Sequence, residues 1–353
     1  MGKPIGSEES QDVEQPKRLQ VGIIGYGLAG WAFHAPLLKA TDFEIAGIVA
    51  REDERIAGAR TDHPEAEVVP HVDALLRLHL DLVVVASVNH AHFEGAANVI
   101  DAGVPIVVEN PVGRDLVMVN RLLDYGMEKR VPITAYYPHR WDSGFLTTAK
   151  VIKSAKLGKI HRIESRLEHW LPTGRPDAWR TKADHEAGVG LLLDLQTHLI
   201  SQALAWAGPA KVAYASLRHL RGGVDDDVTI VLKHLNGIES WLVTSAVSGY
   251  AGPRIQVFGN KGTLVIDEDD AQEDMLIAGQ KPYEGFWPNP VATPARIVQG
   301  DESEDLEPEA GDYPAFYRAC AVALRGKGPW PVPTREILDV TAIIDQAREF
   351  ISR

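Results

Sequence analysis

The sequence predicts an α/β fold in which a doubly wound parallel sheet is followed by an α+β region with a large, mainly antiparallel sheet. Two observations predict the first part: a glycine-rich turn after an apolar run near residue 25, and short apolar segments that alternate with helical ones up to about residue 140. A third observation predicts the second part. Beyond residue 150, at least four successive segments alternate apolar and polar residues, as strands of a half-exposed sheet do.

The glycine-rich turn is the strongest local signal in the chain. Residues 20–24 are an apolar, strand-like run, and glycines follow at G-x-G-x-x-G spacing before a helix expected over residues 28–39. Gly25 allows a tight turn, Gly27 lets the backbone approach a pyrophosphate, and Gly30 lets the helix pack closely on the strand. The helix N-terminus offers N–H groups to phosphates. The expected dinucleotide contacts are Gly25, Tyr26, Gly27, Leu28, Ala29 and Gly30.

The residue that follows the second expected strand, residues 44–50, bears on the choice between NAD and NADP. An acidic residue at this place would bind the ribose 2′-hydroxyl of NAD, whereas an arginine suits the 2′-phosphate of NADP. Arg51 stands here, followed by Glu52 and Asp53. Arg51 favours NADP as the cofactor, while the neighbouring acids keep NAD possible. The alternative interpretation is that Arg51 is only a solvated loop charge.

The order of expected elements divides the chain into three parts. Residues 1–18 are a polar tail expected to be disordered, residues 19–142 a dinucleotide-binding domain, and residues 143–353 a domain for substrate binding and oligomerisation, whose last helices are expected to pack back on the first domain. Acidic residues 267–270 and 301–309 are expected to form solvated loops. Strands are expected at residues 68–69, 81–86, 105–108, 133–136, 159–169, 212–220, 228–235, 238–247 and 254–258, and further helices at residues 92–102, 116–129, 143–155, 190–207, 313–324 and 335–351.

Composition narrows the classes of function. A net charge of −13 argues against nucleic-acid binding and against anionic membrane surfaces. No apolar run approaches the ~20 residues of a spanning helix, and the polar tail lacks the apolar core of a signal peptide. The single cysteine, Cys320, excludes an internal disulfide. These features predict a cytoplasmic protein, and the open antiparallel sheet predicts a homodimer or homotetramer formed through that sheet.

Five motifs, in order, make the chain resemble the glucose-fructose oxidoreductase / inositol dehydrogenase (Gfo/Idh/MocA) family over nearly all of residues 19–350. They are the glycine turn, an N-x-x-H motif at Asn89 and His92, Glu109-Asn110-Pro111 in place of the family's E-K-P, D-L-Q-T-H at residues 194–198 in place of D-x-G-x-H, and G-N-K-G-T at residues 259–263. R-W-D-S-G-F-L-T at residues 140–147 and A-W-R at residues 178–180 look closest to the NADPH-linked scyllo-inositol dehydrogenase branch.

The resemblance implies a nicotinamide-dependent oxidoreductase that acts on a sugar or cyclitol hydroxyl group. In the family, the lysine, the aspartate and the histidine of these motifs surround the reacting carbon, and their positions here are Asn110, Asp194 and His198. From residue types alone, Asp194 and His198 would share one face of a helix, and a histidine exchanges protons near neutrality. No histidine or cysteine spacing indicates a metal site. Further cofactor contacts are expected from Ser87, Asn89, His92, Glu109, Asn110, Arg140 and Trp141, and substrate contacts from His169, Trp179, Arg180, Asp194 and His198.

Two departures from the family's motifs fall at the chemistry. Asn110 replaces the lysine, and an asparagine cannot carry positive charge or shuttle a proton. Gln196 replaces the glycine, and we expect its side chain near the nicotinamide or the substrate. Three functions therefore stay open: an NADP(H)-dependent sugar or cyclitol dehydrogenase or reductase with an altered proton relay, a dinucleotide-binding sensor or regulatory protein without ordinary turnover, and an enzyme that uses tightly held nicotinamide transiently for lyase, epimerase or glycoside-cleaving chemistry.

Overall fold

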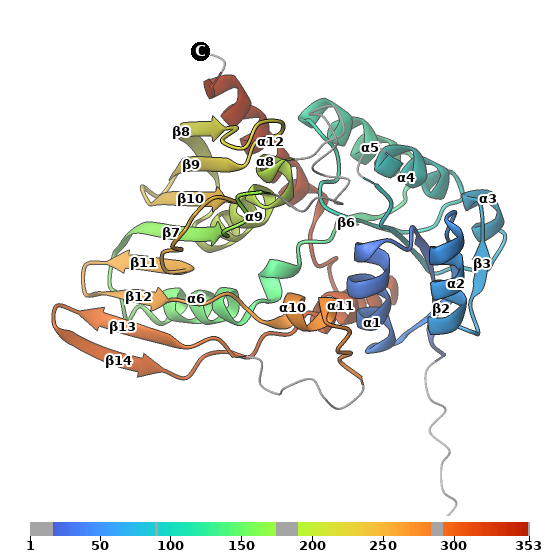
Figure 1. Ribbon diagram of the computed structural model, residues 1–353, viewed down its shortest axis with the longest axis horizontal. Helices are drawn as coiled ribbons and strands as arrows, with labels where there is room; N and C mark the ends of the chain where they lie inside the picture. Colours follow the sequence, from blue (N-terminus) through green and yellow to red (C-terminus); the bar gives the residue numbers. More distant parts are fainter. Residues whose placement is uncertain (1–16, 89–90, 174–189, 284–291, 352–353) are drawn as a thin grey trace, which may run out of the picture.

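The computed structural model describes residues 17–88, 91–173, 190–283 and 292–351, and it contains two sheets (Figure 1). The first has six strands in the order β3-β2-β1-β4-β5-β6, and the second has eight in the order β14-β13-β12-β11-β7-β10-β9-β8. All pairs of the first sheet are parallel. The predicted fold class, a parallel sheet joined to a mainly antiparallel one, is confirmed.

The first sheet is built from buried apolar strands whose order reverses between β1 and β4, where ligands bind in open α/β sheets. Its strands are β1 (Leu19–Ile24), β2 (Phe43–Val49), β3 (Glu67–Val69), β4 (Leu82–Val85), β5 (Ile106–Val108) and β6 (Ile133–Ala135). Its helices are η1 (Ala29–His34), α1 (Ala35–Lys39), α2 (Asp53–Asp62), α3 (Val72–Leu75), α4 (His92–Asp101) and α5 (Leu116–Lys129).

The helix expected after the glycine turn differs from the prediction at its start. Its first segment, η1, is a π-helix in which the Ala35 N–H bonds the Gly30 carbonyl. This wider turn directs the His34 side chain inward, where it is fully buried with its ring 4.6 Å from that of Tyr136. Such turns often occur at functional sites. The sequence pattern of apolar residues does not distinguish a π-helical turn from an α-helical one.

The second sheet is antiparallel except for the parallel pair β7 and β10. One face packs on helices α6 (Ser143–Ser154) and α9 (Gln196–Ala207), which lie along it in Figure 1. Its strands are β7 (Ile160–Glu168), β8 (Ala210–Arg218), β9 (Asp227–His234), β10 (Glu239–Ser245), β11 (Ile255–Gly259), β12 (Gly262–Ile266), β13 (Ala295–Gln299) and β14 (Glu302–Leu306).

The acidic segment 301–309 is not the loop that the sequence predicts, because it contains β14. The strand pairs with β13 through its backbone while four of its five side chains are exposed, so it lacks the alternation of apolar residues that marks a half-buried strand. Residues 267–270 do form a loop, as predicted. That loop leads into a short helix that the sequence pattern does not predict, α10 (Gln272–Ile277).

The helix expected over residues 190–207 is two helices, α8 (Leu191–Asp194) and α9, with a break at Leu195. Asp194 and His198 therefore do not share one continuous helix. Gln196 begins α9 and explains part of this geometry, because its buried Nε2 donates to the carbonyls of Val228 (3.1 Å) and Leu242 (3.2 Å). The expectation that Gln196 reaches the nicotinamide or substrate is wrong: its side chain ties α9 to β9 and β10.

The two C-terminal helices, α11 (Pro314–Leu324) and α12 (Thr334–Ile351), pack against the first sheet's half of the molecule. Thr134 Oγ1 donates to the Val332 carbonyl at 2.9 Å, just before α12. Within α12, Asp345 accepts from the Leu116 N–H at the start of α5 (2.8 Å), and Gln346 accepts from the Val212 N–H in β8 (3.3 Å). Neighbouring residues of one helix thus bind both halves of the chain.

Two kinds of feature are absent from the residues that the structure describes. No helix there combines the length and apolar character needed to cross a membrane. No three histidine, cysteine or acidic side chains of the same residues gather so that they would hold a metal ion.

Candidate functional site

The turn after β1 has a shape that only glycine permits. Gly25 has φ of +101°, and a Cβ on it would lie 2.6 Å from the Ala86 carbonyl oxygen. A Cβ on Gly30 would lie 2.1 Å from the carbonyl oxygen of Gly25 itself. Both distances are far below van der Waals contact, so the first and third glycines of the motif are required by the backbone. The strand, turn and helix follow one another as a dinucleotide-binding turn demands.

A cavity of about 260 Å³ opens at the carboxyl ends of β1, β2 and β4, beside this turn. Four residues predicted to contact the cofactor line it: Gly25, Tyr26, Arg51 and Ser87. The hydroxyl oxygen of Ser87 is buried without a hydrogen-bond partner among the described residues, so a ligand in the cavity would supply one. The next four residues of the turn, Gly27, Leu28, Ala29 and Gly30, are not among the residues that line this cavity.

Sequence reasoning missed the second arginine of this cavity. Arg55 lies in the first turn of α2, four residues after Arg51, and both line the cavity. Arg55 Nε also pairs with Glu52 Oε2 at 3.0 Å. The available signal was a second arginine four residues after Arg51, at the start of the helix that follows the same strand.

Two residues predicted to contact the cofactor, His92 and Glu109, make hydrogen bonds and an ion pair with the segments around the cavity. The His92 ring nitrogens lie 2.9 Å from the Pro111 carbonyl and 2.8 Å from the Ser87 carbonyl, so the ring joins the loops after β4 and β5. Burial lowers the pKa of His92. Glu109 accepts from the N–H of Asn110 at 2.6 Å and lies 3.0 Å from His34 Nε2. Asn89 lies outside the described residues.

The side chain of Asn110 reaches from the end of β5 to the break between α8 and α9. Its Nδ2 lies 3.2 Å from the Leu193 carbonyl, 2.9 Å from the Asp194 carbonyl and 3.3 Å from His198 Nε2. The break leaves those two carbonyls without helical partners other than the Thr197 hydroxyl, so the amide satisfies them. Asn110 and His198 are both buried, and they bring the first sheet's edge against α9.

These contacts fix which nitrogen of His198 carries a proton. If the Asn110 amide were turned over, its oxygen would face the Leu193 and Asp194 carbonyl oxygens, and three acceptors would repel one another. The NH₂ group therefore faces α8 and His198. A proton on either ring nitrogen lacks an acceptor, because an amide nitrogen does not accept and Nδ1 has no hydrogen-bond partner among the described residues. An unprotonated Nε2, however, accepts from the Asn110 amide, so we assign the hydrogen of the neutral ring to Nδ1. Burial lowers the pKa of His198 well below its usual range, and the nearby cations lower it further.

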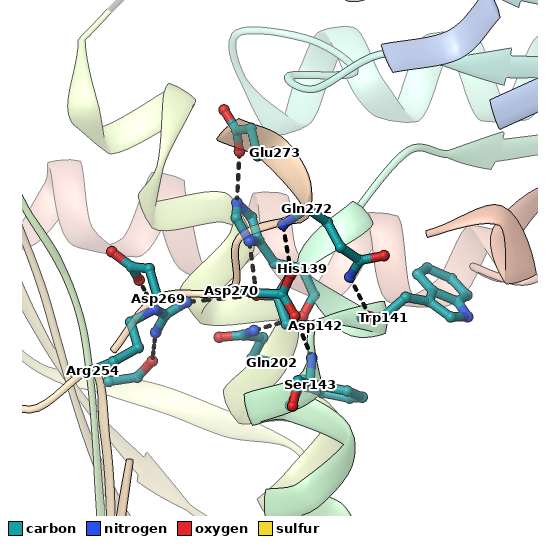
Figure 2. A network of polar contacts seen from close by, with 12 residues as sticks. His139, Trp141, Asp142, Ser143, Gln202, Arg254, Asp269, Asp270, Gln272 and Glu273 are labelled. Carbon is teal, nitrogen blue, oxygen red and sulfur yellow. Dashed lines mark hydrogen bonds and ion pairs between the residues drawn. The ribbon is translucent and has the colours of Figure 1, made fainter. Parts of the chain in front are cut away.

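Next to His198 lies a network of charged and polar side chains, most of them buried, that the sequence analysis does not predict (Figure 2). It centres on His139 in η3 (Pro138–Trp141), which stands between Asp142 and Glu273. Gln202 Nε2 donates to the His139 carbonyl at 2.7 Å, which fixes η3 on α9. Arg254 bonds Asp269 and Ser165 at 2.6 and 2.7 Å. The sequence feature that could have indicated this network is His139 directly before the R-W-D segment, together with the acidic residues 267–270, which were predicted to form a solvated loop.

Residues 267–270 were predicted to be a solvated loop, and Asp270 shows that this prediction is wrong for part of the loop. Its carboxylate accepts from the N–H of Ser143 at 2.6 Å and from the N–H of Gln272 at 2.9 Å. Burial, and after it the charge of Asp142, raises the pKa of Asp270 to about 6. Asp269 and Asp270 therefore belong to the polar network, although they lie in the predicted loop.

The structure does not bring the remaining predicted residues to the cavity beside the glycine turn. Arg140 pairs with Glu336 on α12, and Trp141 packs edge-on against Phe316 with ring centroids 5.3 Å apart. His169 is exposed at the end of β7, where its N–H bonds the Ser245 carbonyl. Trp179 and Arg180 lie outside the described residues.

Comparison with known proteins places this geometry in a family. Residues 19–137 match the model of an oxidoreductase family with an NAD-binding Rossmann fold, and residues 145–265 match that of the GFO/IDH/MocA C-terminal domain. Scyllo-inositol 2-dehydrogenase (NADP(+)) of Bacillus subtilis is 30% identical over 94% of this chain and 93% of its own. Myo-inositol 2-dehydrogenase of Thermotoga maritima is 26% identical over 70% of this chain and 75% of its own.

Solved structures agree with that placement. A structure from Yersinia pestis has a TM-score of 0.86 at 28% identity, covering 96% of both chains. An oxidoreductase from Bacillus cereus has a TM-score of 0.81 at 25% identity, covering 93% of this chain and 95% of its own. With both family models matched in order and a relative similar over nearly the whole length, the chain belongs to the GFO/IDH/MocA family of NAD(P)-binding oxidoreductases.

Proposed function

We propose that the chain is an NADP(H)-dependent dehydrogenase or reductase that acts on a hydroxyl or carbonyl group of a sugar or cyclitol. The observation that carries the proposal is the position of His198, whose unprotonated Nε2 lies beside Asn110 at the carboxyl end of β5. In a doubly wound sheet, this edge is where the reactive part of a dinucleotide comes to lie. The similarity to a scyllo-inositol 2-dehydrogenase (NADP(+)) supports a cyclitol as the substrate class.

The residues around the cavity fit a dinucleotide. The turn has no room for a Cβ at Gly25 or Gly30, Ser87 has a buried hydroxyl oxygen without a partner, and Arg51 and Arg55 supply two cations at the end of β2. Two guanidinium groups at this place suit the 2′-phosphate of NADP better than the bare hydroxyl of NAD. When bound, the nicotinamide would accept or donate a hydride at the substrate carbon.

The proton that accompanies the hydride is handled by His198 in this proposal. A neutral imidazole with a free Nε2 accepts the proton of a substrate hydroxyl, and such catalysis contributes about 10²–10⁴-fold. The Asn110 amide has two backbone carbonyls as other partners, so it can give up its longest contact to a substrate oxygen. Among the described residues, the other proposed substrate contacts are Asp194, whose carbonyl accepts from the Asn110 amide, and His169 at the end of β7.

A second candidate is a dinucleotide-binding sensor without ordinary turnover. The neutral Asn110 amide favours it, because an alkoxide-like transition state gains less from a dipole than from a lysine charge. The amide is also occupied in bracing α8 and α9, which is a structural role.

Absorbance of the nicotinamide during incubation with a panel of inositols and aldoses tests the proposal. We expect NADP(H)-linked turnover with at least one compound and a loss of about 10²-fold or more in the His198→Ala variant, with dinucleotide affinity nearly unchanged. His161→Ala, an exposed residue on β7, is the matched control. Tight NADP(H) binding without turnover of any compound would favour the sensor. Product formation without net cofactor change would favour transient use of the nicotinamide.

A further inference from the structure

A second imidazole packs against that of His198. The rings of His139 and His198 have centroids 4.6 Å apart and planes at 77°, so one ring meets the other edge to face. The His139 side chain is only 12% exposed. It lies in η3, directly after β6, and the loop that carries Asn110 follows the neighbouring strand β5. Two adjacent strands thus deliver the two side chains that touch His198.

The surroundings of His139 hold it as a cation. Its Nδ1 lies 2.9 Å from Asp142 Oδ2 and its Nε2 lies 3.7 Å from Glu273 Oε2, so both ring nitrogens face carboxylates (Figure 2). Asp142 is fixed in turn by the hydroxyl of Tyr313, which donates to Oδ1 at 2.9 Å. Burial by itself would lower the pKa of His139. The charge of Asp142, its hydrogen bond and the charge of Glu273 outweigh burial and raise that pKa to about 9.

Burial is the largest cause of the lowered pKa of His198, and the charged groups around its ring oppose a second proton further. Arg254, which precedes β11, adds positive charge to that of His139, and Asn110 presents N–H groups to Nε2. The Tyr137 ring lies 6.1 Å away and is neutral, because burial raises its pKa far above neutrality. Two further charged groups on neighbouring described elements are Arg140 in η3, which is paired with Glu336 on α12, and Asp194 in α8.

We propose that His139 is a positioning residue for proton transfer: its cation, fixed between Asp142 and Glu273, keeps the His198 ring unprotonated so that Nε2 is available as the proton acceptor. The inference rests on the proposed function, since it assigns His139 a part in that reaction. It also assigns a role to the buried carboxylate of Asp142 and to the half-buried one of Glu273. They hold a charge beside the acceptor without touching the substrate.

Long-range ¹⁵N–¹H spectra of the full-length protein with labelled histidine test this directly, because they report the charge and tautomer of each ring without any substrate. The His198 signals are assigned from the His198→Gln variant. In the parent protein we expect His198 to be neutral with Nδ1 protonated from pH 6 to 9, and His139 to be charged up to about pH 9. A neutral His139 at pH 7, or a charged His198, overturns the inference.

Two variants separate the electrostatic role from a packing role. His139→Gln removes the charge, and Glu273→Gln removes only the partner that is 43% exposed, so that the fold is kept. We expect the pKa of His198 to rise by about one unit or more in the first and by less in the second, since a nearby like charge is lost or weakened. His161→Gln, remote on β7, is the control and should leave that pKa unchanged. An unchanged His198 pKa in both test variants overturns the inference.

The kinetic readout keeps this inference apart from the proposed function. If a substrate is found, His139→Gln should move the acidic limb of kcat/KM to higher pH by about one unit at unchanged NADPH affinity. If the His139→Gln variant turns over substrate and the acidic limb of its kcat/KM profile is at the same pH as in the parent protein, the role of His139 is refuted and the proposed function is not. If the histidine spectra are as expected but no compound is turned over, the proposed function is refuted, whereas the effect of His139 on His198 is supported.

Discussion

Nδ2 of Asn110 lies 3.3 Å from Nε2 of His198, although 88 residues separate the two in the chain. The contact joins the loop after β5 of the parallel sheet to α9, which packs on the second sheet. The proton acceptor of the proposed reaction therefore lies where the two halves of the molecule meet. Its chemistry depends on how that junction is built, and the following predictions test its parts.

Replacing Asn110 by lysine tests whether the neutral amide limits catalysis. We predict that the parent protein oxidises common inositols and aldoses only weakly, and that the rate increases by about tenfold or more in Asn110→Lys, because a positive charge stabilises a developing alkoxide. The lysine ammonium can also donate to the Leu193 and Asp194 carbonyls, so the fold should tolerate it.

Asn110→Ala is the control for that substitution. It removes the amide donor of the Leu193 and Asp194 carbonyls, leaves them only the Thr197 hydroxyl, and should lower the free energy of unfolding by about 1–3 kcal/mol without raising activity. If Asn110→Lys abolishes an activity of the parent protein on another substrate, the asparagine is a working part of different chemistry. Robust parent activity on a cyclitol, unaffected by Asn110→Ala, would show that the position matters little.

The two arginines at the end of β2 should set the cofactor preference. Calorimetric titration should show tighter binding of NADP(H) than of NAD(H). Arg51→Ala should reduce the ratio of NADP(H) affinity to NAD(H) affinity by about tenfold or more, since a charge-assisted hydrogen bond to phosphate contributes about 1.5–3 kcal/mol. Arg55→Ala should reduce this ratio as well. Arg60→Ala, an exposed α2 residue that does not line the cavity, is the control. Equal affinities in the parent protein would refute the role of Arg51.

A matched pair of glycines tests the glycine turn itself. A Cβ at Gly30 would meet the Gly25 carbonyl oxygen at 2.1 Å, so Gly30→Ala should lower dinucleotide affinity by about tenfold or more and lower the melting temperature. A Cβ at Gly58 in α2 would meet nothing within 4 Å. Gly58→Ala should therefore raise the free energy of unfolding by about 0.5–1 kcal/mol. Normal cofactor binding by Gly30→Ala would contradict the proposed dinucleotide-binding turn.

The outward face of the second sheet should form the interface between copies of the chain. The Arg162 guanidinium lies 5.6 Å from the Trp241 ring and 3.9 Å from the Phe258 ring, and Trp241 is still 41% exposed. We expect a dimer or tetramer by light scattering at micromolar concentration. Trp241→Glu should shift it toward monomers, because it places a carboxylate across from Glu164 on β7.

Leu235→Glu provides the control for the interface. Leu235 is 78% exposed at the turn between β9 and β10, so its substitution changes an apolar side chain to the same acid away from the centre of that face. A parent protein that is monomeric, or an assembly that Trp241→Glu leaves intact, would refute the sheet as the interface.

Local sequence signals predict the parts of the fold that local forces decide. The helix predicted over residues 116–129 is α5 with the same bounds, because the Asp115 side chain accepts from the Met118 N–H at its start and Arg130 adopts φ of 59° at its end. The break at Leu195 has no such signal. It depends on Gln196 bonding carbonyls of β9 and β10, which are distant in the chain.

The candidate site divides in the same way. Gly25, Arg51 and Ser87 were predictable because each follows an apolar strand, and the ends of parallel strands meet at one edge. The role of His139 was not predictable from the sequence, since nothing in its own segment shows that Asp142, Glu273 and His198 lie around its ring. Arg140 is the opposite case. Its segment predicts a cofactor contact, but in the structure the Arg140 side chain forms an ion pair with Glu336, which is distant in the chain.

The attachment of α12 has a mechanical consequence. Asp345 binds the start of α5 and Gln346 binds β8, so a single rigid helix is fastened on two sides. Rotating one half against the other would break at least one of these attachments, which opposes hinge bending. The spacing between Asn110 and His198 is then set when the chain folds and does not wait for a ligand. Discrimination among polyols would rest on the fit of hydroxyl groups to a fixed template, and the chain should unfold in denaturant as one cooperative unit.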